Sequence, residues 1–447
     1  MSYSALLKNA DGYALAFKAN DITTDKMRAA IPEWFELYYQ ERPENGEDPC
    51  QRIPYTIVRK LTKTIFAEYE ATSKNEYVDS ILKSLEHKSS EAMQMALIGG
   101  ESKLKPIPTG DGFRFVVVPR YNILVFGRDA EGNMTDIGTV ERTAYGNAYY
   151  TLMERRTVDE GGYLTISNRL FRSYNKENLG QEVPLNSIPF YAQLEPEYTF
   201  TKPVGSVGLV GLQTPIANCV DGSPDCVSVY AAAIGLIHNI NRNEAQLNGE
   251  FDRGESRVIV SQDMLDDNKL KDNVFVGLDD DQQTVGITAF SPALREASFL
   301  ARKQEYLRNV ENIIGLKRGL LSEVETADRT ATEITSSEGE YNLTVIDFQR
   351  MWENTVKEVL RVCGVLGQLY KIPGAHEIPE DAAVINWGNG VLYDEDKTWA
   401  DYKDMVAKGL LKPEIAMGWR FNMPTKTEAD LRKIREQLMP EALEEVE

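Results

Sequence analysis

The side chains that most often carry out chemistry are few and scattered in this sequence. His87, His238 and His376 are far apart along the chain, and none lies in a metal-binding or catalytic spacing. Neither an H-E-x-x-H zinc motif nor a G-x-S-x-G nucleophile motif occurs. We therefore predict no catalytic residue, and we expect the protein not to be an enzyme.

Cofactor and metal motifs are equally sparse. The run Asp279-Asp280-Asp281 has the oxygen ligands that hard cations prefer, but without EF-hand spacing around it a solvated turn is expected. The glycines at 205, 208 and 211 do not follow the dinucleotide-binding pattern. Of the four cysteines only Cys219 and Cys226 are close, and no C-x-x-C occurs. We expect reduced thiols, no metal and no cofactor.

The composition is that of an acidic chain with enough apolar residues for a sizeable core. Its 447 residues are 42% hydrophobic and suggest about three structural units. Asp and Glu number 69 against 49 Lys and Arg, a net charge of −20, which excludes the basic footprint of a tight DNA binder. The most apolar stretch, 227–237, is interrupted by Ser228 and is too short to cross a membrane. The N-terminus lacks the apolar run of a signal peptide, so no membrane partner is expected.

The first half of the chain predicts helices followed by an antiparallel sheet. Apolar residues recur at helical spacing over 24–98, where Pro43 and Pro54 separate the first two helices and Gly99-Gly100 ends the last. From 113 to 200 the pattern is that of strands. Short loops rich in Gly, Asn and Asp join them and indicate a hairpin meander; the loops are 129–133, 144–147 and 159–162.

The second half predicts two helices around a small strand-rich insertion. A helix from Val227 has an apolar face interrupted only by Glu244, and Gly254 would end it. Candidate strands follow at 257–260, 274–278 and 284–290. Ser291-Pro292 then has the signature of a helix start. In that helix two sets of side chains recur every seven residues, which favours packing against neighbouring helices; they are Phe299, Tyr306, Ile313 and Leu300, Leu307, Ile314.

A glycine-flanked loop, 315–319, leads to the longest helical pattern of the chain. This pattern runs from Thr330 to Tyr370, about 60 Å if it is continuous, and Pro373 would end it. The C-terminal part predicts a strand at 384–387 and helical segments around 398–411, 413–421 and 427–438. Thr425 and Glu428 have the spacing of a capping box for the last of them.

Three segments in this order resemble the portal proteins of tailed bacteriophages, in the branch found in long-tailed phages of Gram-positive hosts. The first is F-D-R-G-E-S-R-V-I-V at 251–260, followed by Met264-Leu265. The second is T-A-T-E-I at 330–334, followed by Ser336-Ser337 and the long helix. The third is M-V-A-K-G-L-L at 405–411.

The resemblance implies an α+β fold with the parts of a portal subunit. These are a helical stem, a small α/β clip, a mixed wing with the antiparallel meander and the very long helix, and a helical crown. In this chain they would be wing 1–226, stem helix 227–255, clip 256–291, stem helix 292–314, tunnel loop 315–330, wing 331–393 and crown 394–447.

It also implies a function: subunits form a ring, typically a dodecamer, at one capsid vertex. Double-stranded DNA would pass through the ring during packaging and ejection. The expected partners are other copies of the chain, terminase, the head–tail adaptor, and the major capsid or scaffolding protein. The expected location is the virion, after assembly in the host cytoplasm.

Within this frame the tunnel loop gives the candidate DNA-facing residues, Lys317 and Arg318. Residues 251–330 contain 11 Lys and Arg against 15 Asp and Glu, a mixed lining that suits sliding better than grip. The alternatives are another structural head component or a head–tail adaptor, a ring-forming scaffold unrelated to phages, and an intracellular enzyme of unrecognised type. Adaptors are usually much shorter and lack so long a helix, and an enzyme would need clustered catalytic residues.

Overall fold

A computed structural model describes residues 10–39, 50–253, 257–261, 275–278, 288–290, 294–323, 331–388, 395–421, 423–425 and 427–439. The chain divides into two compact units, which are treated separately below. The first is Met1–Ile65 with Ala71–Val384, and the second is Phe66–Glu70 with Ile385–Glu447. Helices and mainly antiparallel sheets make up the described residues, so the predicted α+β class is confirmed.

Four helices open the described part of the first unit; the last three lie within 24–98, where the sequence predicts helix, and the first precedes that region. They are α2 (Ala10–Phe17), α3 (Asp25–Tyr39), α4 (Ile53–Ile65) and α5 (Glu76–Gly99). Pro54 lies in the first turn of α4, a position that lacks a helical N–H partner anyway. The predicted end of α5 at Gly99-Gly100 is confirmed, since Gly100 adopts a φ of 83°. Pro43 lies outside the described residues.

Helix α5 packs against a three-stranded sheet in the order β10-β2-β3. The strands are β2 (Glu101–Pro108), β3 (Phe113–Pro119) and β10 (Val210–Gln213), and both pairings are antiparallel. The sequence pattern predicts β3 but neither β2 nor β10.

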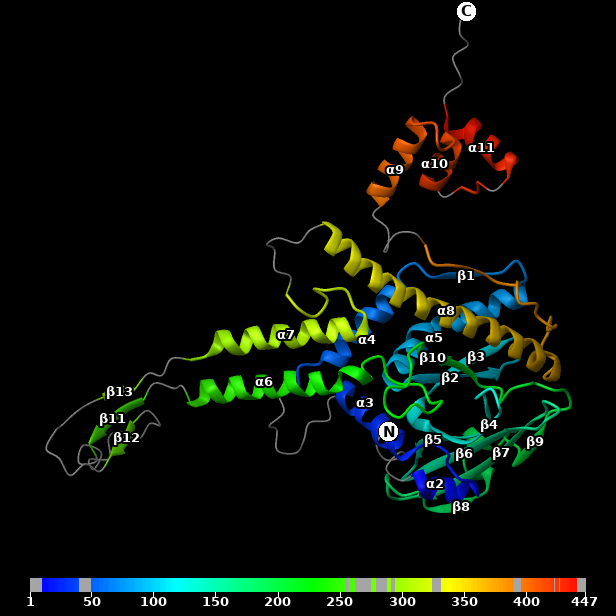
Figure 1. Cartoon of the computed structure of the whole chain (residues 1–447). Helices are drawn as coiled ribbons and strands as arrows, with labels where there is room; N and C mark the ends of the chain where they lie inside the picture. The colour runs from blue at the N-terminus through cyan, green and yellow to red at the C-terminus, as the bar shows by residue number, and fades with distance from the viewer. Residues whose placement is uncertain are drawn as a thin grey trace, which may run out of the picture. The chain divides into compact units, whose positions relative to one another are not determined.

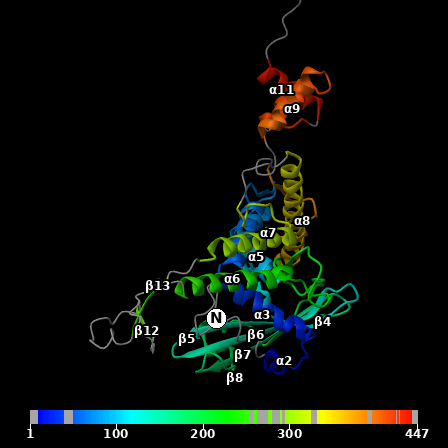
Figure 2. The ribbon, with the colours of Figure 1, turned by 60° about the vertical axis from the view of Figure 1, so that its left-hand side comes forward.

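The predicted antiparallel meander forms a second sheet, in the order β4-β5-β6-β7-β8 with β9 also paired to β7. Tyr145 pairs with Ala148 across a two-residue turn between β5 and β6. Tyr13 and Phe17 of α2 pack on one face of this sheet, against Leu124, Val140 and Met153. Figures 1 and 2 both show α2 lying against these strands. The bounds are β4 Ile123–Arg128, β5 Met134–Tyr145, β6 Ala148–Val158, β7 Leu164–Ser173, β8 Gln181–Val183 and β9 Glu197–Thr199.

Two long helices, α6 (Ile234–Arg253) and α7 (Glu296–Ile314), form a hairpin around the insertion. Its strands β11 (Arg257–Ser261), β12 (Phe275–Leu278) and β13 (Thr288–Phe290) form one sheet in which β11 is central. The β11–β12 pairing is parallel and the β11–β13 pairing antiparallel. Figure 1 shows α6 and α7 side by side, with these strands between them in the chain. The strand predictions are thus confirmed in type and order. Gly254 and Asp279–Asp281 lie outside the described residues.

Both helices of the hairpin begin later than predicted. Residues 227–230 precede the 3-10 turn η4 (Ala231–Ala233) because tertiary bonds hold them: the Val229 N–H donates to the Leu97 carbonyl at 2.9 Å, and the Thr214 hydroxyl to the Val227 carbonyl at 2.8 Å. The predicted start at Ser291-Pro292 is also wrong. Arg295 is the N-cap of α7 and has non-helical backbone angles, and its side chain is held across the hairpin by Glu250.

The long helical pattern is confirmed as α8 (Ala331–Leu369), which ends four residues before Pro373. The short strands β1 (Glu70–Thr72) and β14 (Val384–Asn386) lie where the chain passes from one unit to the other. Single 3-10 turns complete the first unit at Arg120–Asn122 (η1), Leu185–Ser187 (η2) and Pro189–Tyr191 (η3).

The described residues of the second unit form three helices, α9 (Glu395–Ala407), α10 (Pro413–Arg420) and α11 (Glu428–Leu438). The predicted capping box at Thr425 and Glu428 is wrong by two residues. Helix α11 begins at Glu428, so Thr427 is the N-cap, and its hydroxyl and backbone exchange hydrogen bonds with Asp430. The pattern Thr-x-x-acid occurs twice in this stretch, and the second copy is the one that sits at the helix start.

Candidate functional site

The α6–α7 hairpin and the loop that follows α7 contain the residues to which the sequence assigns a function. Two contacts fix the antiparallel pairing of α6 and α7 in the half of the hairpin that is nearer to the insertion. Arg295 donates to both carboxylate oxygens of Glu250, at 3.0 and 2.7 Å, and this carboxylate raises the pKa of Arg295. The Asn243 side-chain amide donates to the Phe299 carbonyl at 3.0 Å. These bonds set the helix register at the point where the insertion leaves the hairpin.

Glu244, the one charged residue in the apolar face of α6, has a partner on α7. The Lys303 ammonium donates to the Glu244 carboxylate at 2.9 Å, and both side chains are only 22% exposed. The same ammonium donates to the Gln51 side chain at 2.9 Å, and the Gln51 N–H donates to the Asn241 side chain at 3.0 Å. The polar interruption is therefore an anchor that ties the hairpin to the residues just before α4.

The half of the hairpin near the insertion has little cover other than the partner helix. No residue between 294 and 306 is buried, and the first buried residue of α7 is Leu307. Leu300 and Phe251 are each 44% exposed there. Surface of this kind, with large apolar side chains on a pair of helices, is typical of a protein–protein contact.

The seven-residue repeats of α7 divide between two environments. Leu307 and Ile314 are buried, whereas Phe299 and Tyr306 are partly exposed and Ile313 is 48% exposed. Two guanidinium groups lie over the aromatic rings of Phe299 and Tyr306. Arg295 lies over Phe299 at 5.7 Å, and Arg302 lies over Tyr306 at 5.4 Å. One edge of α7 is thus an accessible stripe of apolar and aromatic side chains.

The chain leaves α7 through Gly315, which adopts a left-handed φ of 75°, and enters the loop with Lys317 and Arg318. Lys317 is partly exposed and Arg318 is exposed, and both take part in further interactions. The structure places the two predicted residues side by side on one loop. Residues 324–330 of the predicted tunnel loop lie outside the described residues.

A buried carboxylate organises this loop. Glu311, in the last turn of α7, is 0% exposed. It accepts hydrogen bonds from the N–H groups of Gly319, Leu321 and Ser322 at 2.5 to 3.1 Å, and from the Ser322 hydroxyl at 2.7 Å.

Two further bonds hold the same loop to neighbouring helices. The Lys60 ammonium, from α4, donates to the Leu320 carbonyl, and the Glu323 N–H donates to the Gln304 side chain at 2.8 Å. Sequence reasoning missed Glu311, Lys60 and Gln304. Only Glu311 left a signal: it lies on the α7 face that also carries the buried side chains Leu307 and Ile314.

The described residues give little support to a catalytic reading. His238 bonds with Glu33 at 2.9 Å and His376 with Asn75 at 3.2 Å, in different places, and His87 is exposed on α5. Among the described residues no group of His, Cys, Asp and Glu could hold a metal ion. In the described part, no helix combines the length with the apolar composition that a membrane crossing needs.

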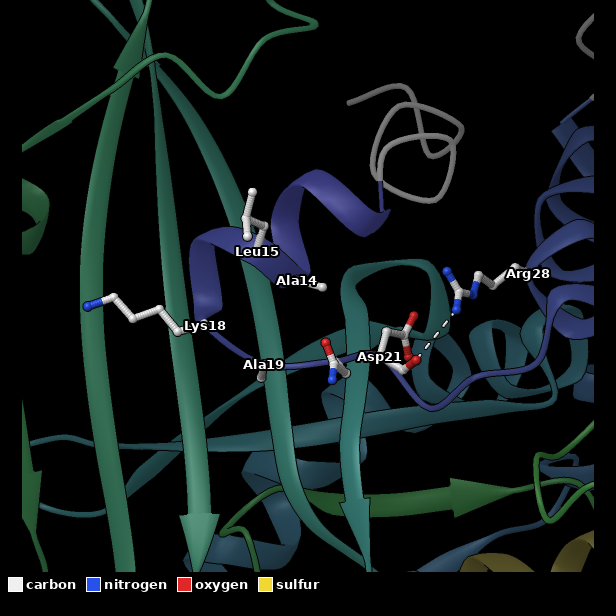
Figure 3. A pocket seen from close by; sticks show the side chains of 7 residues that line it. Ala14, Leu15, Lys18, Ala19, Asp21 and Arg28 are labelled. Atoms are coloured by element: carbon white, nitrogen blue, oxygen red, sulfur yellow. Dashed lines mark hydrogen bonds between the residues drawn. The ribbon is translucent and has the colours of Figure 1, made fainter.

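A pocket of about 460 Å³ lies between the end of α2 and the start of α3 (Figure 3). Lys18, Asp21 and Arg28 supply its charges. The Arg28 guanidinium is engaged with backbone, donating to the Thr23 carbonyl at 3.0 Å and the Asp21 carbonyl at 3.4 Å. With no nucleophile, histidine or metal cluster along its lining, this pocket offers no acid–base couple.

Comparisons with known proteins give likenesses in structure but none in sequence. No protein-family model matches the chain, and no curated protein matches its sequence. Among solved structures it is similar to a chain in the neck of the native GTA particle, computed with C12 symmetry. The two are 11% identical, and the likeness covers 92% of this chain and 98% of the other at a TM-score of 0.48.

Proposed function

We propose that this chain is a portal protein of a tailed bacteriophage. In this proposal it is a non-enzymatic subunit of a ring, a dodecamer in the assembled particle, through which double-stranded DNA enters and leaves the capsid. The observation that carries the proposal is the α6–α7 hairpin, whose far half has no buried residue on α7 and keeps Phe251 and Leu300 at 44% exposure. Neighbouring copies arranged in a closed ring would cover that surface on every subunit.

The order of elements gives each part of the chain a role in the proposal. Residues 227–255 and 292–314 are the stem, 256–291 the clip, 315–330 the tunnel loop, 1–226 and 331–393 the wing, and 394–447 the crown. The clip contains the sheet of β11, β12 and β13 and is the docking site for terminase during packaging and for the head–tail adaptor afterwards. The wing faces the major capsid or scaffolding protein, and the finished ring is part of the virion after assembly in the host cytoplasm.

Charge supports a channel in which DNA slides. A surface that neutralises many phosphates holds DNA through counterion release, and the overall charge of −20 opposes such a grip. Lys317 and Arg318, adjacent on the loop after α7, are the candidates for transient phosphate contacts.

The double variant Lys317→Ala with Arg318→Ala tests this role. We expect rings to assemble normally and DNA packaging or retention in the head to fall. A matched control removes two cations from α5, Lys83→Ala with Lys88→Ala, where the ion pairs are local and exposed. Packaging and retention unchanged from wild type in the loop variant would contradict the DNA-facing assignment.

Removal of the clip tests the docking role. A chain in which a short Gly-Ser linker replaces residues 256–291 keeps both helices of the hairpin, because their mutual contacts lie outside that segment. We expect such a chain to form rings that terminase no longer binds. Terminase binding that survives the deletion would place the docking site elsewhere.

The principal alternative is another structural head component or a head–tail adaptor. The 39 residues of α8 favour the portal reading, because adaptors are usually far shorter chains without such a helix. A ring with a channel too narrow for duplex DNA would favour the alternative, or a scaffold unrelated to phages.

A further inference from the structure

Glu311 occupies a position that does not suit a carboxylate. It lies in the last turn of α7, where the helix dipole disfavours negative charge, and on a face whose other side chains, Leu307, Val310 and Ile314, are buried. A leucine at this position would complete the apolar face. A buried carboxylate is stable only where hydrogen-bond donors surround it, so the reason for this glutamate must lie in its partners.

In the part of the chain that the structure describes, the hydrogen-bond partners of the Glu311 side chain come from the loop that follows. One carboxylate oxygen accepts the N–H groups of Gly319, Leu321 and Ser322, and the other accepts the Ser322 hydroxyl. Within the described residues no lysine or arginine pairs with this carboxylate. The four donors satisfy the buried charge, and in turn the carboxylate satisfies four donors of the loop.

The bonds to Glu311 hold the loop so that it turns back towards the N-terminal end of α7. Glu323 reaches Gln304, which lies seven residues before Glu311, and Lys60 of α4 donates to the Leu320 carbonyl from the other side. Gly315 allows the reversal because its φ of 75° is accessible to glycine at little cost. One side chain therefore fixes residues 319–322 together, and with them the direction in which Lys317 and Arg318 leave α7.

We propose that Glu311 is a latch that holds the loop 315–322 in a closed position. Because a single carboxylate makes all four bonds, its loss or displacement frees Gly319, Leu321 and Ser322 together and leaves the bonds to Lys60 and Gln304 to hold the loop. The importance of this release for DNA rests on the proposed function, since it is the channel role that gives Lys317 and Arg318 a ligand. The latch itself is a property of the chain and is measured without DNA.

The variant Glu311→Gln removes the charge and keeps the size. A glutamine amide can keep its one acceptor oxygen towards the three N–H groups and turn its NH₂ group towards the Ser322 hydroxyl, which can accept from it, so the variant chiefly turns charged bonds into weaker neutral ones. We expect hydrogen exchange at the amides of Gly319, Leu321 and Ser322 to rise by about tenfold or more, since a bond to a charged acceptor is among the stronger ones. We also expect trypsin to cleave the folded variant after Lys317 or Arg318 faster than it cleaves the wild type.

Two further variants make the result specific. Ser322→Ala removes only the hydroxyl bond and keeps the three N–H bonds, so its exchange rates should fall between those of wild type and Glu311→Gln. Glu154→Gln is the matched control: Glu154 is also buried, but it lies on β6 and binds Lys105 and Arg156, each at 2.7 Å, and not the loop. It should leave exchange and cleavage in the loop unchanged.

Exchange at wild-type rates in a folded Glu311→Gln protein would overturn the latch. If that variant does not fold, Ser322→Ala decides the question, and loop exchange that does not rise in it overturns the latch as well. A chain that shows the expected order of exchange rates but never forms rings would contradict the proposed function and leave the latch standing.

Discussion

The anchor between Glu244, Lys303 and Gln51 allows a quantitative test of how the hairpin is held. The Glu244–Lys303 distance is 2.9 Å and each side chain is 22% exposed. At an effective dielectric constant of about 20, two unit charges at this distance attract by about 6 kcal/mol. Desolvation and the ordering of two long side chains offset most of this, which leaves a net coupling of about 1–2 kcal/mol.

The perturbation is a double-mutant cycle of Glu244→Ala, Lys303→Ala and the double variant. Lys303→Ala should cost more free energy of unfolding than Glu244→Ala, by about 1 kcal/mol, because it also removes the bond to Gln51. The control is the same cycle on Lys88 and Glu91, which are closer, at 2.7 Å, but 37% and 49% exposed. That pair should couple by no more than about 0.5 kcal/mol.

Urea denaturation gives the free energies, and hydrogen exchange of the α6 and α7 amides shows where protection is lost. Coupling no larger than that of the control pair would refute the reasoning that partial burial makes this pair an anchor. Equal costs for the two single variants would show that the bond from Lys303 to Gln51 contributes nothing.

Three further predictions follow from other contacts. Burial alone would raise the pKa of Glu154, but Arg156 and Lys105 lower it to about 2, from an ordinary value of 4.5. Glu154 therefore contributes its full stabilisation above about pH 4.5 and loses it as the pH falls towards 2; urea titrations should show a loss of about 3 kcal/mol that Glu154→Gln abolishes. Gly315→Ala should cost about 1–2 kcal/mol in the same assay, because φ is 75° and the new Cβ would lie 2.6 Å from the Thr344 hydroxyl; an unchanged midpoint would contradict this. Leu300→Asp should leave the fold intact and weaken ring assembly about tenfold or more, measured by native mass, since covering a side chain that is 44% exposed contributes about 1 kcal/mol per contact; rings as stable as wild type would exclude Leu300 from the contact.

The elements with regular apolar spacing were predictable from the sequence. Helix α8 was predicted at 330–370 and spans Ala331–Leu369, because the side chains at three- and four-residue steps are the ones that are buried. Val345, Trp352 and Val356 of that series are each 0% exposed. In the meander, glycine-containing turns marked the strand ends in the same direct way.

Strand β2 could not be found by its pattern because two of its buried residues, Glu101 and Lys103, are charged. Glu101 and Lys103 are 1% and 6% exposed and pair with each other at 3.3 Å, and Arg120 pairs with Glu101 at 3.1 Å. Lys105 pairs with Glu154 at 2.7 Å. Arg120 and Glu154, which compensate Glu101 and Lys105, lie far from them in the sequence, and spacing alone does not reveal such partners.

The position of the loop after α7 was predictable from the sequence, but its organisation was not. The glycine-flanked loop with Lys317 and Arg318 was identified, and its attachment to Glu311, Lys60 and Gln304 was not. Those bonds depend on the loop turning back along α7, a path that begins at Gly315 and that only the folded chain defines. The later starts of α6 and α7 have the same origin, since tertiary hydrogen bonds compete with the local signals for helix formation.

The most direct test of the central claim is the native mass of the purified chain, together with negative-stain images of the same sample. The portal proposal predicts closed rings of about twelve subunits with a central channel wide enough for duplex DNA. A closed ring whose channel is too narrow for duplex DNA, or an open filament, would contradict it.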